Sequence, residues 1–339
     1  MNQSKFSLAD VLAVLAALAF GFVCFMGANF LNINNDKVWG MPHTIGCIVM
    51  ALIIALLLFG TAFGAKLLKR ISSNFKTCFV LEVVLLGLFV LLAVFFVTKT
   101  SPFPHYFTVT AQKSEINSKL QTSITQAGNM FVKYEAYAGS RENLYENTLK
   151  RVAGSQKGDP KAYTDFGFVV NSGIPDALQI KTKMFTVHAD LFPTNYSDTI
   201  AGSGIKEVAS KWLQDAKNTT SSWKPIGIVG VVNDVEKNSN YWLNTLVTLS
   251  QIREQGEKAD DFGYSLSFDD VKTHFITLGS PTGLAIGLAV LAYVLMLLSY
   301  IFTIRSTKSK YGIRALFRAL FRVLVSKKQN NNSDFDIDY

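Results

Sequence analysis

The chain has 339 residues, of which 49% are hydrophobic and 17% are charged, and its formal net charge is +8. Its three cysteines, Cys24, Cys47 and Cys78, all lie in or beside apolar segments, which excludes a small domain held together by disulfides. Residues 99–279 contain 19 basic and 19 acidic side chains, so the positive excess lies beside the apolar segments and does not indicate nucleic-acid binding.

Many of the hydrophobic residues are gathered into four long runs. The runs cover residues 8–31, 44–68, 78–97 and 280–304. Because a helix needs ~20 apolar residues to cross ~30 Å of hydrocarbon, each run predicts a transmembrane helix. The first run is too long for the apolar part of a cleaved signal peptide. We therefore expect three spans in residues 1–98, an extracytoplasmic domain in 99–279, a fourth span in 280–304, and a cytoplasmic helix and tail in 305–339.

Small residues recur at four-residue spacing in three of these runs. Small side chains let the backbones of membrane helices approach one another closely. We therefore expect the first, second and fourth spans to pack together and the third, which is rich in Leu, Val and Phe, to face lipid. The residues expected at these helix contacts are Ala9, Ala13, Ala17, Gly21, Gly60, Gly64, Gly283 and Gly287.

Two acidic residues, Asp10 and Glu82, fall about one turn inside the first and third runs. A carboxylate in a span is costly and is a candidate functional residue. Both lie near basic residues at the same end of the runs, so the sequence favours structural ion pairs over a path for protons. The basic residues in question are Lys66, Lys69, Arg70 and Lys76.

The distribution of Lys and Arg predicts the orientation in the membrane, because these residues remain on the cytoplasmic side. The loop after the second run and the tail after the fourth are rich in them, whereas the loop after the first run has only Lys37, next to Asp36. Both termini are therefore expected in the cytoplasm and the polar domain outside. A large outer domain without cysteine favours a bacterial inner membrane, with the domain periplasmic or extracellular.

The polar domain is expected to be mostly helical. Apolar side chains recur at helical spacing in residues 116–134, 178–192, 205–216 and 229–254. Ser140 is expected to begin a separate helix through Val152, and Ser267 to begin a short one with a capping box. The alternative is a mixed α/β domain with strands at 166–171 and 226–232. In layout alone, the chain resembles bacterial receptors whose helical sensor domain lies between two spans.

No catalytic motif stands out. The S-x-x-K spacing at Ser203 and Ser221 lacks the K-T-G element of penicillin-binding enzymes. His43, His105 and His274 are all expected at the outer membrane face, where imidazoles could bind zinc or copper, but they lack short ligand spacing. We therefore expect interfacial histidines and no metal or other cofactor.

Residues 310–328 have the pattern of a basic amphipathic helix. Arg314, Arg318 and Arg322 form one stripe, and Phe317 and Phe321 lie among the apolar residues of the other side. Such a helix is typical of a segment that binds the surface of an anionic membrane. Docking on a partner protein is the alternative.

The sequence as a whole favours a non-enzymatic membrane protein. Its outer domain is expected to bind a partner protein or a second copy of the chain, as a scaffold or a sensing subunit of a membrane complex. One alternative is an accessory subunit of a transporter or channel, because an oligomer could line a pore. The other is a membrane enzyme with a metal site at the outer interface.

Overall fold

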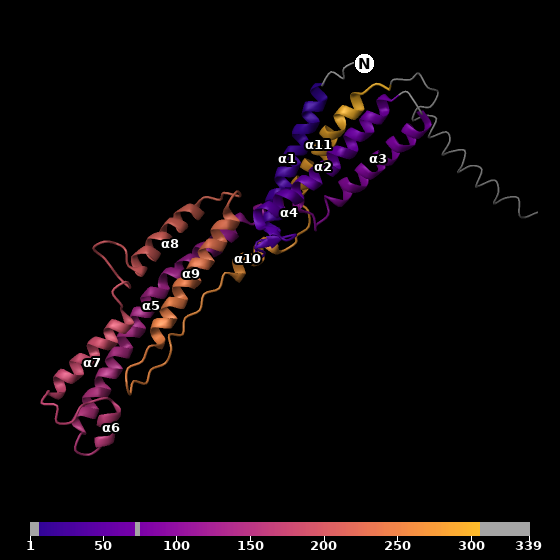
Figure 1. The fold of residues 1–339 in the computed structure, drawn as a ribbon. Coiled ribbons are helices and arrows are strands. Elements are labelled where there is room, and N and C mark those ends of the chain that lie inside the picture. Colours follow the sequence, from indigo (N-terminus) through magenta and orange to yellow (C-terminus); the bar gives the residue numbers. More distant parts are fainter. Residues whose placement is uncertain (1–6, 72–74, 306–339) are drawn as a thin grey trace, which may run out of the picture. The chain divides into compact units, whose positions relative to one another are not determined.

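The computed structural model describes residues 7–71 and 75–305, and this part of the chain is mainly helical (Figure 1). Its helices are α1 (Leu8–Leu31), α2 (His43–Arg70), α3 (Phe75–Phe95), α4 (Pro102–Ala111), α5 (Lys113–Gly154), α6 (Pro160–Asp165), α7 (Asp176–Leu191), α8 (Ile205–Ser221), α9 (Ile228–Gln251), α10 (Asp269–Ile276) and α11 (Gly283–Phe302). In the described part, strands are limited to a hairpin of β1 (Lys37–Val38) and β2 (Met41–Pro42). The mixed α/β alternative is wrong, because residues 166–171 form turns and irregular chain and α9 already begins at Ile228.

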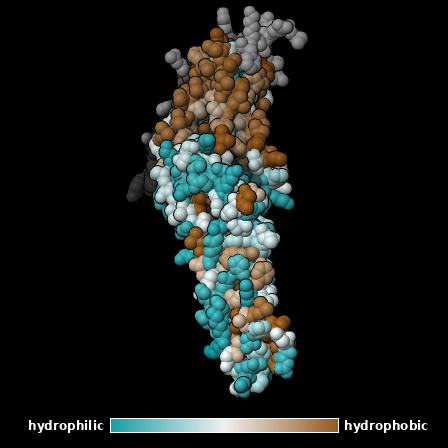
Figure 2. All heavy atoms as spheres, turned by 90° about the vertical axis from the view of Figure 1, so that its left-hand side faces the viewer, coloured by the Kyte–Doolittle hydropathy of each residue, from teal (hydrophilic) through white to brown (hydrophobic). Residues whose placement is uncertain are grey.

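Four of these helices, α1, α2, α3 and α11, are long and apolar enough to cross a membrane, and they coincide with the four apolar runs of the sequence. They contain 24, 28, 21 and 20 residues. The helix α2 continues beyond the apolar run through Lys69 and Arg70, where two cations suit the negative end of the helix dipole. In Figure 2 these helices present a largely hydrophobic surface, whereas the helices between α3 and α11 present a mixed and mainly hydrophilic one.

The chain folds as two compact units. Unit 1 comprises Met1–Gly21, Leu52–Phe96 and Gly287–Tyr339, and unit 2 comprises Phe22–Ala51 and Val97–Ile286. The apolar helices α1, α2 and α11 contribute residues to both units, whereas α3 belongs to unit 1 and α4–α10 belong to unit 2.

The predicted small-residue contacts occur on α1 but not throughout. Ala13, Ala17 and Gly21 are buried and Ala9 is half-buried, as expected for a packed stripe. On α11, Gly283 and Gly287 are exposed, and a Cβ added at either would meet nothing within 4 Å, so their part in helix packing stays a prediction. The small residues that α11 buries are Ala285 and Ala289, which lie two positions further along the helix and therefore on another face.

On α2 the two glycines differ. Gly60 is exposed with nothing within 4 Å of an added Cβ, whereas a Cβ on Gly64 would lie 3.0 Å from the Leu85 side chain of α3. Gly64 therefore lets α3 approach α2, and Gly60 makes no packing contact among the described residues. The helix α3 is the most exposed of the four apolar helices. Of its apolar 18-residue stretch, 17% is buried, compared with 28–44% in the other three, as its lack of small residues predicts.

In unit 2, the backbone of α1 comes very close to the start of α4 at Gly27. A Cβ on Gly27 would lie 1.8 Å from the carbonyl oxygen of Pro102. Pro102 stands at the first position of α4, where its missing N–H costs no helical hydrogen bond. Glycine at position 27 therefore allows α1 to pack directly on the backbone of α4.

The helix α5 is the central element of unit 2. It has 42 residues and is therefore roughly 60 Å long, and α7, α8, α9 and α10 pack against it (Figure 1). The predicted start of a separate helix at Ser140 is wrong, because α5 continues through that position. The expected capping box at Ser267 is also not formed: Phe268 is the residue before α10, and the Ser267 hydroxyl accepts from the N–H of Asp269 at 3.2 Å.

Aromatic side chains form much of the core along α5. Tyr134 is fully buried and lies against Phe192, Tyr196 and Phe262, with ring centroids 5.4–6.1 Å apart. Its hydroxyl donates to the carbonyl of Leu191 at 2.9 Å, and burial raises the pKa of its phenol. The core thus joins α5, α7 and the chain after α9 through one tyrosine.

Candidate functional site

A segment without helix or strand, residues 252–268, connects α9 to α10 in unit 2 and turns at residues 255–256. Phe262 and Phe268 are buried, and the side chains between them alternate between half-buried and exposed. This is the two-residue period of a β-strand, but no backbone–backbone hydrogen bond pairs residues 258–267 with another described residue. The segment is therefore a strand-like chain laid on helices.

A buried arginine holds the beginning of this segment against α5. The Nε atom of Arg141 lies 2.5 Å from Glu257, and both side chains are at most 2% exposed. The same guanidinium donates to the carbonyls of Ser250 at 3.0 Å and of Ile252. Burial alone would lower the pKa of Arg141, but the hydrogen bond and charge of Glu257 raise that pKa overall. Arg141 thus satisfies the backbone where α9 ends.

Three tyrosine hydroxyl groups join the same segment to α5 further along. On α5, the hydroxyl of Tyr145 donates to the carbonyl of Gln255 at 3.0 Å, and that of Tyr137 donates to the carbonyl of Asp260 at 2.6 Å. On the segment, the hydroxyl of Tyr264 donates to the carbonyl of Gln126 on α5 at 2.8 Å. Each bond spans two elements, so the path of the segment along α5 is fixed at several points. A loop held in this way presents its outer face as a defined surface.

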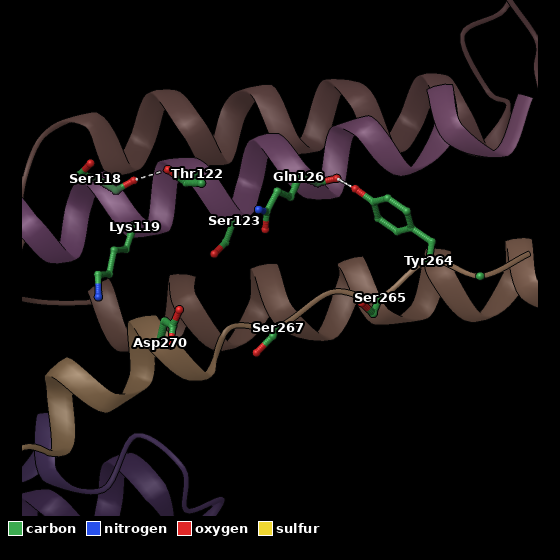
Figure 3. A pocket seen from close by; sticks show the side chains of 10 residues that line it. Ser118, Lys119, Thr122, Ser123, Gln126, Tyr264, Ser265, Ser267 and Asp270 are labelled. Atoms are coloured by element: carbon green, nitrogen blue, oxygen red, sulfur yellow. Dashed lines mark hydrogen bonds between the residues drawn. The ribbon is translucent and has the colours of Figure 1, made fainter. Parts of the chain in front are cut away.

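A polar groove lies between α5 and the last part of this segment (Figure 3). Its volume is about 590 Å³. It is lined by Ser118, Lys119, Thr122, Ser123 and Gln126 of α5 and by Gly263, Tyr264, Ser265, Ser267 and Asp270. The lining thus combines hydroxyl and amide groups with one basic and one acidic side chain, which suits hydrogen bonding to a polar partner.

The wall formed by residues 263–266 has unused backbone groups. None of their N–H or C=O groups takes part in a hydrogen bond with a described residue. Next to this wall, the N–H of Phe262 donates to the hydroxyl of Ser250 on α9 at 3.2 Å. Such a row of free donors and acceptors on an extended chain can accept a further strand.

The residues of the groove show no assembled catalytic group. No histidine or cysteine lines it, and the Lys119 ammonium lies 3.9 Å from Glu115 on the exposed surface of α5. The Thr122 hydroxyl donates to the backbone of Ser118 at 3.0 Å, as polar residues commonly do within a helix.

The three histidines considered as metal ligands have separate partners. The ring of His43 lies 2.5 Å from the amide oxygen of Asn29, and the ring of His274 lies 3.1 Å from the amide oxygen of Gln112. His105 is buried with its Nε2 atom 2.6 Å from a backbone carbonyl, and burial lowers its pKa. Within residues 7–71 and 75–305, no group of three or more His, Cys, Asp or Glu side chains could hold a metal ion.

The two acidic residues of the spans do form ion pairs. Asp10 pairs with Lys66, as the sequence predicts, and both side chains are 5% exposed. Glu82 accepts from Arg305 at 2.7 Å through both carboxylate oxygens and from the Tyr300 hydroxyl at 2.6 Å. The partner of Glu82 thus comes from the chain after α11 and not from the loop before α3.

The predicted membrane-surface residues Arg314, Arg318, Arg322, Phe317 and Phe321 lie outside the described part of the chain. No protein-family model, no curated protein and no solved structure matches the chain. The polar groove is therefore interpreted from its own geometry.

Proposed function

We propose that this chain is a non-enzymatic membrane scaffold or sensing subunit that binds a partner protein through unit 2. The four apolar helices anchor it, and the Lys and Arg distribution favours cytoplasmic termini with residues 99–279 outside, in a bacterial inner membrane. The bound part of the partner is an extended polar peptide that lies in the polar groove. Either a different protein or a second copy of the chain can supply it.

The observation that carries this proposal is the unpaired extended wall of the groove at residues 263–266. An added peptide strand would use these backbone groups, which gives affinity with little demand on the sequence of the partner. Specificity would come from the side chains across the groove. Lys119 and Asp270 lie toward one end of it, on opposite walls (Figure 3), so a peptide with one charge of each sign there would be complementary.

Site-specific photo-crosslinking tests this proposal in the intact membrane. A photoreactive residue in place of Ser265, which is exposed and lines the groove, is expected to give a discrete crosslinked product. The matched control replaces Ser210, an exposed serine on α8 outside the groove, and should give none. The mass of the product shows whether the partner is a different protein or a second copy. Equal products from both positions, or none from position 265, would contradict the proposal.

A proline substitution then tests the use of the backbone. Ser265→Pro removes one N–H from the wall, whereas Ser265→Ala removes only the hydroxyl. Because an unpaired acceptor on the partner costs about 1–3 kcal/mol, Ser265→Pro should weaken binding by about tenfold, with Ser265→Ala close to wild type. Crosslinking from position 267 in each variant measures this, with far-ultraviolet circular dichroism as the control for folding. Equal loss in both variants would show that the hydroxyl and not the backbone is recognised.

A further inference from the structure

A second cavity lies in unit 1, where α1 begins, α2 ends and α11 ends. Its volume is about 540 Å³. It is lined by Ser7, Leu8, Ala9 and Leu12, by Lys66 and Arg70, and by Leu298, Ser299, Phe302, Thr303 and Ile304. The cavity is separate from the polar groove, and nothing in the proposed function makes use of it.

Of the two basic side chains that line this cavity, one has no counter-ion among the described residues. Lys66 is buried and pairs with Asp10, which also accepts hydrogen bonds from the hydroxyls of Ser7 and Ser299. This network neutralises the charge of Lys66 on one wall. Arg70 is exposed, lines the cavity and forms no ion pair or hydrogen bond with a described residue. Among the described residues no carboxylate lines the cavity, so the described lining together with Asp10 carries a net charge of about +1.

The remaining lining is mostly aliphatic or aromatic. Leu8, Phe302 and Ile304 are each at least 70% exposed although they belong to apolar membrane helices or follow one directly. Such side chains at the end of a span are ordinarily in contact with lipid acyl chains. The cavity therefore has a guanidinium without a counter-ion among the described residues, beside apolar surfaces. An anionic phospholipid matches both features, because its phosphate can pair with the guanidinium and its acyl chains can contact the apolar side chains.

We propose that this cavity binds one anionic phospholipid. The guanidinium of Arg70 holds the phosphodiester, and the acyl chains lie against the apolar side chains of α1 and α11. A single negative charge on the headgroup matches the single uncompensated cation. The bound lipid fills the space between helices that belong to the beginning and the end of the chain, so it stabilises their packing within unit 1.

Competition between two lipids tests the site on the full-length protein. The protein in detergent is incubated with equimolar phosphatidylglycerol and phosphatidylcholine, and the lipid that remains bound after purification is measured by mass spectrometry. The wild type is expected to retain phosphatidylglycerol about fivefold over phosphatidylcholine, and Arg70→Gln to lose this preference. Lys76→Gln is the matched control, because Lys76 is an exposed cation at the start of α3 that does not line the cavity. It should keep the preference.

Two further experiments distinguish lipid binding in this cavity from nonspecific attraction of anionic lipid to the protein. Thr303→Trp places a bulky ring in the cavity just after α11 while keeping all charges, and should reduce the amount of both bound lipids. Glycerol phosphate in excess should not displace the lipid, because it cannot use the apolar walls. Equal losses in Arg70→Gln and Lys76→Gln, unchanged binding in Thr303→Trp, or displacement by glycerol phosphate would each overturn the proposal. Thermal unfolding of each variant confirms that it is folded.

Discussion

Replacing Arg141 with methionine is expected to destabilise unit 2 by about 3–5 kcal/mol, because it leaves Glu257 buried without its counter-ion. The carboxylate is only 1% exposed and cannot regain water without moving the chain. The carbonyls of Ser250 and Ile252 each lose one donor in the same step, although Arg253 still donates to both. Thermal unfolding of the purified protein, followed by far-ultraviolet circular dichroism, should show a lower transition temperature. Limited proteolysis should cut within residues 252–268 first, since Arg141 holds that segment on α5.

The control for this change is Lys150→Met, which breaks the exposed pair between Lys150 and Glu146 one turn apart on the same helix. Such surface pairs contribute ~0–1 kcal/mol, so the transition should hardly move. The double variant Arg141→Met with Glu257→Leu should recover part of the loss, because it removes the uncompensated charge. If Arg141→Met behaved like Lys150→Met, the buried pair would not be what holds the segment.

Gly27→Ala is expected to have the second large effect, since the added methyl group has no room. Its carbon would lie 1.8 Å from the carbonyl oxygen of Pro102 and 2.7 Å from the carbonyl carbon, and neither is the end of a flexible side chain. The helices α1 and α4 would have to separate, at a cost of about 3 kcal/mol or more. The yield of folded protein from membranes and its transition temperature should both fall.

Gly60→Ala provides the comparison, because it makes the same change on an exposed face of α2 with nothing within 4 Å. Alanine is favoured over glycine in a helix by about 0.5–1 kcal/mol, so this variant should be as stable as the wild type or slightly more so. A loss at position 60 equal to that at position 27 would mean that the glycines matter for helix contacts beyond those within one chain.

The helices could be predicted from the sequence wherever the signal was local. The apolar run from Leu8 to Leu31 matches α1 in full, and the repeating pattern from Ile205 to Ala216 lies within α8. The break expected at Ser140 shows the limit of such reasoning. Serine often precedes a helix, but α5 continues because its apolar face extends through Tyr145 and Leu149 into the core.

The polar groove could not be predicted in the same way. It depends on Arg141 meeting Glu257, which follows 116 residues later, and on Tyr264 reaching Gln126, 138 residues away. The available signal was the alternation from Phe262 to Phe268, which has the period of a strand. In an otherwise helical domain, such a run without a second strand nearby indicates a segment laid on helices.

The pairing of the intramembrane carboxylates was predictable only in part. When the first two spans are placed side by side, Lys66 and Asp10 lie at a similar depth in the membrane. Their proximity could therefore be predicted from the sequence. Arg305 lies 223 residues from Glu82, and only the packing of α11 with α3 brings them together. The burial of Tyr293 beside Phe89, with its hydroxyl 3.0 Å from the carbonyl of Ala93, belongs to the same contact.

We expect four spans to hold residues 99–279 on the outer side of the membrane, and cysteine labelling in intact cells tests this orientation most directly. Cys24 and Cys47 are fully buried, and Cys78 would be replaced by serine. Lys157→Cys places a thiol on an exposed loop after α5, and Ser326→Cys places one in the tail, outside the described residues. With a membrane-impermeant maleimide, position 157 should label before permeabilisation and position 326 only after it. Labelling of position 326 alone in intact cells would place residues 99–279 in the cytoplasm and contradict the account.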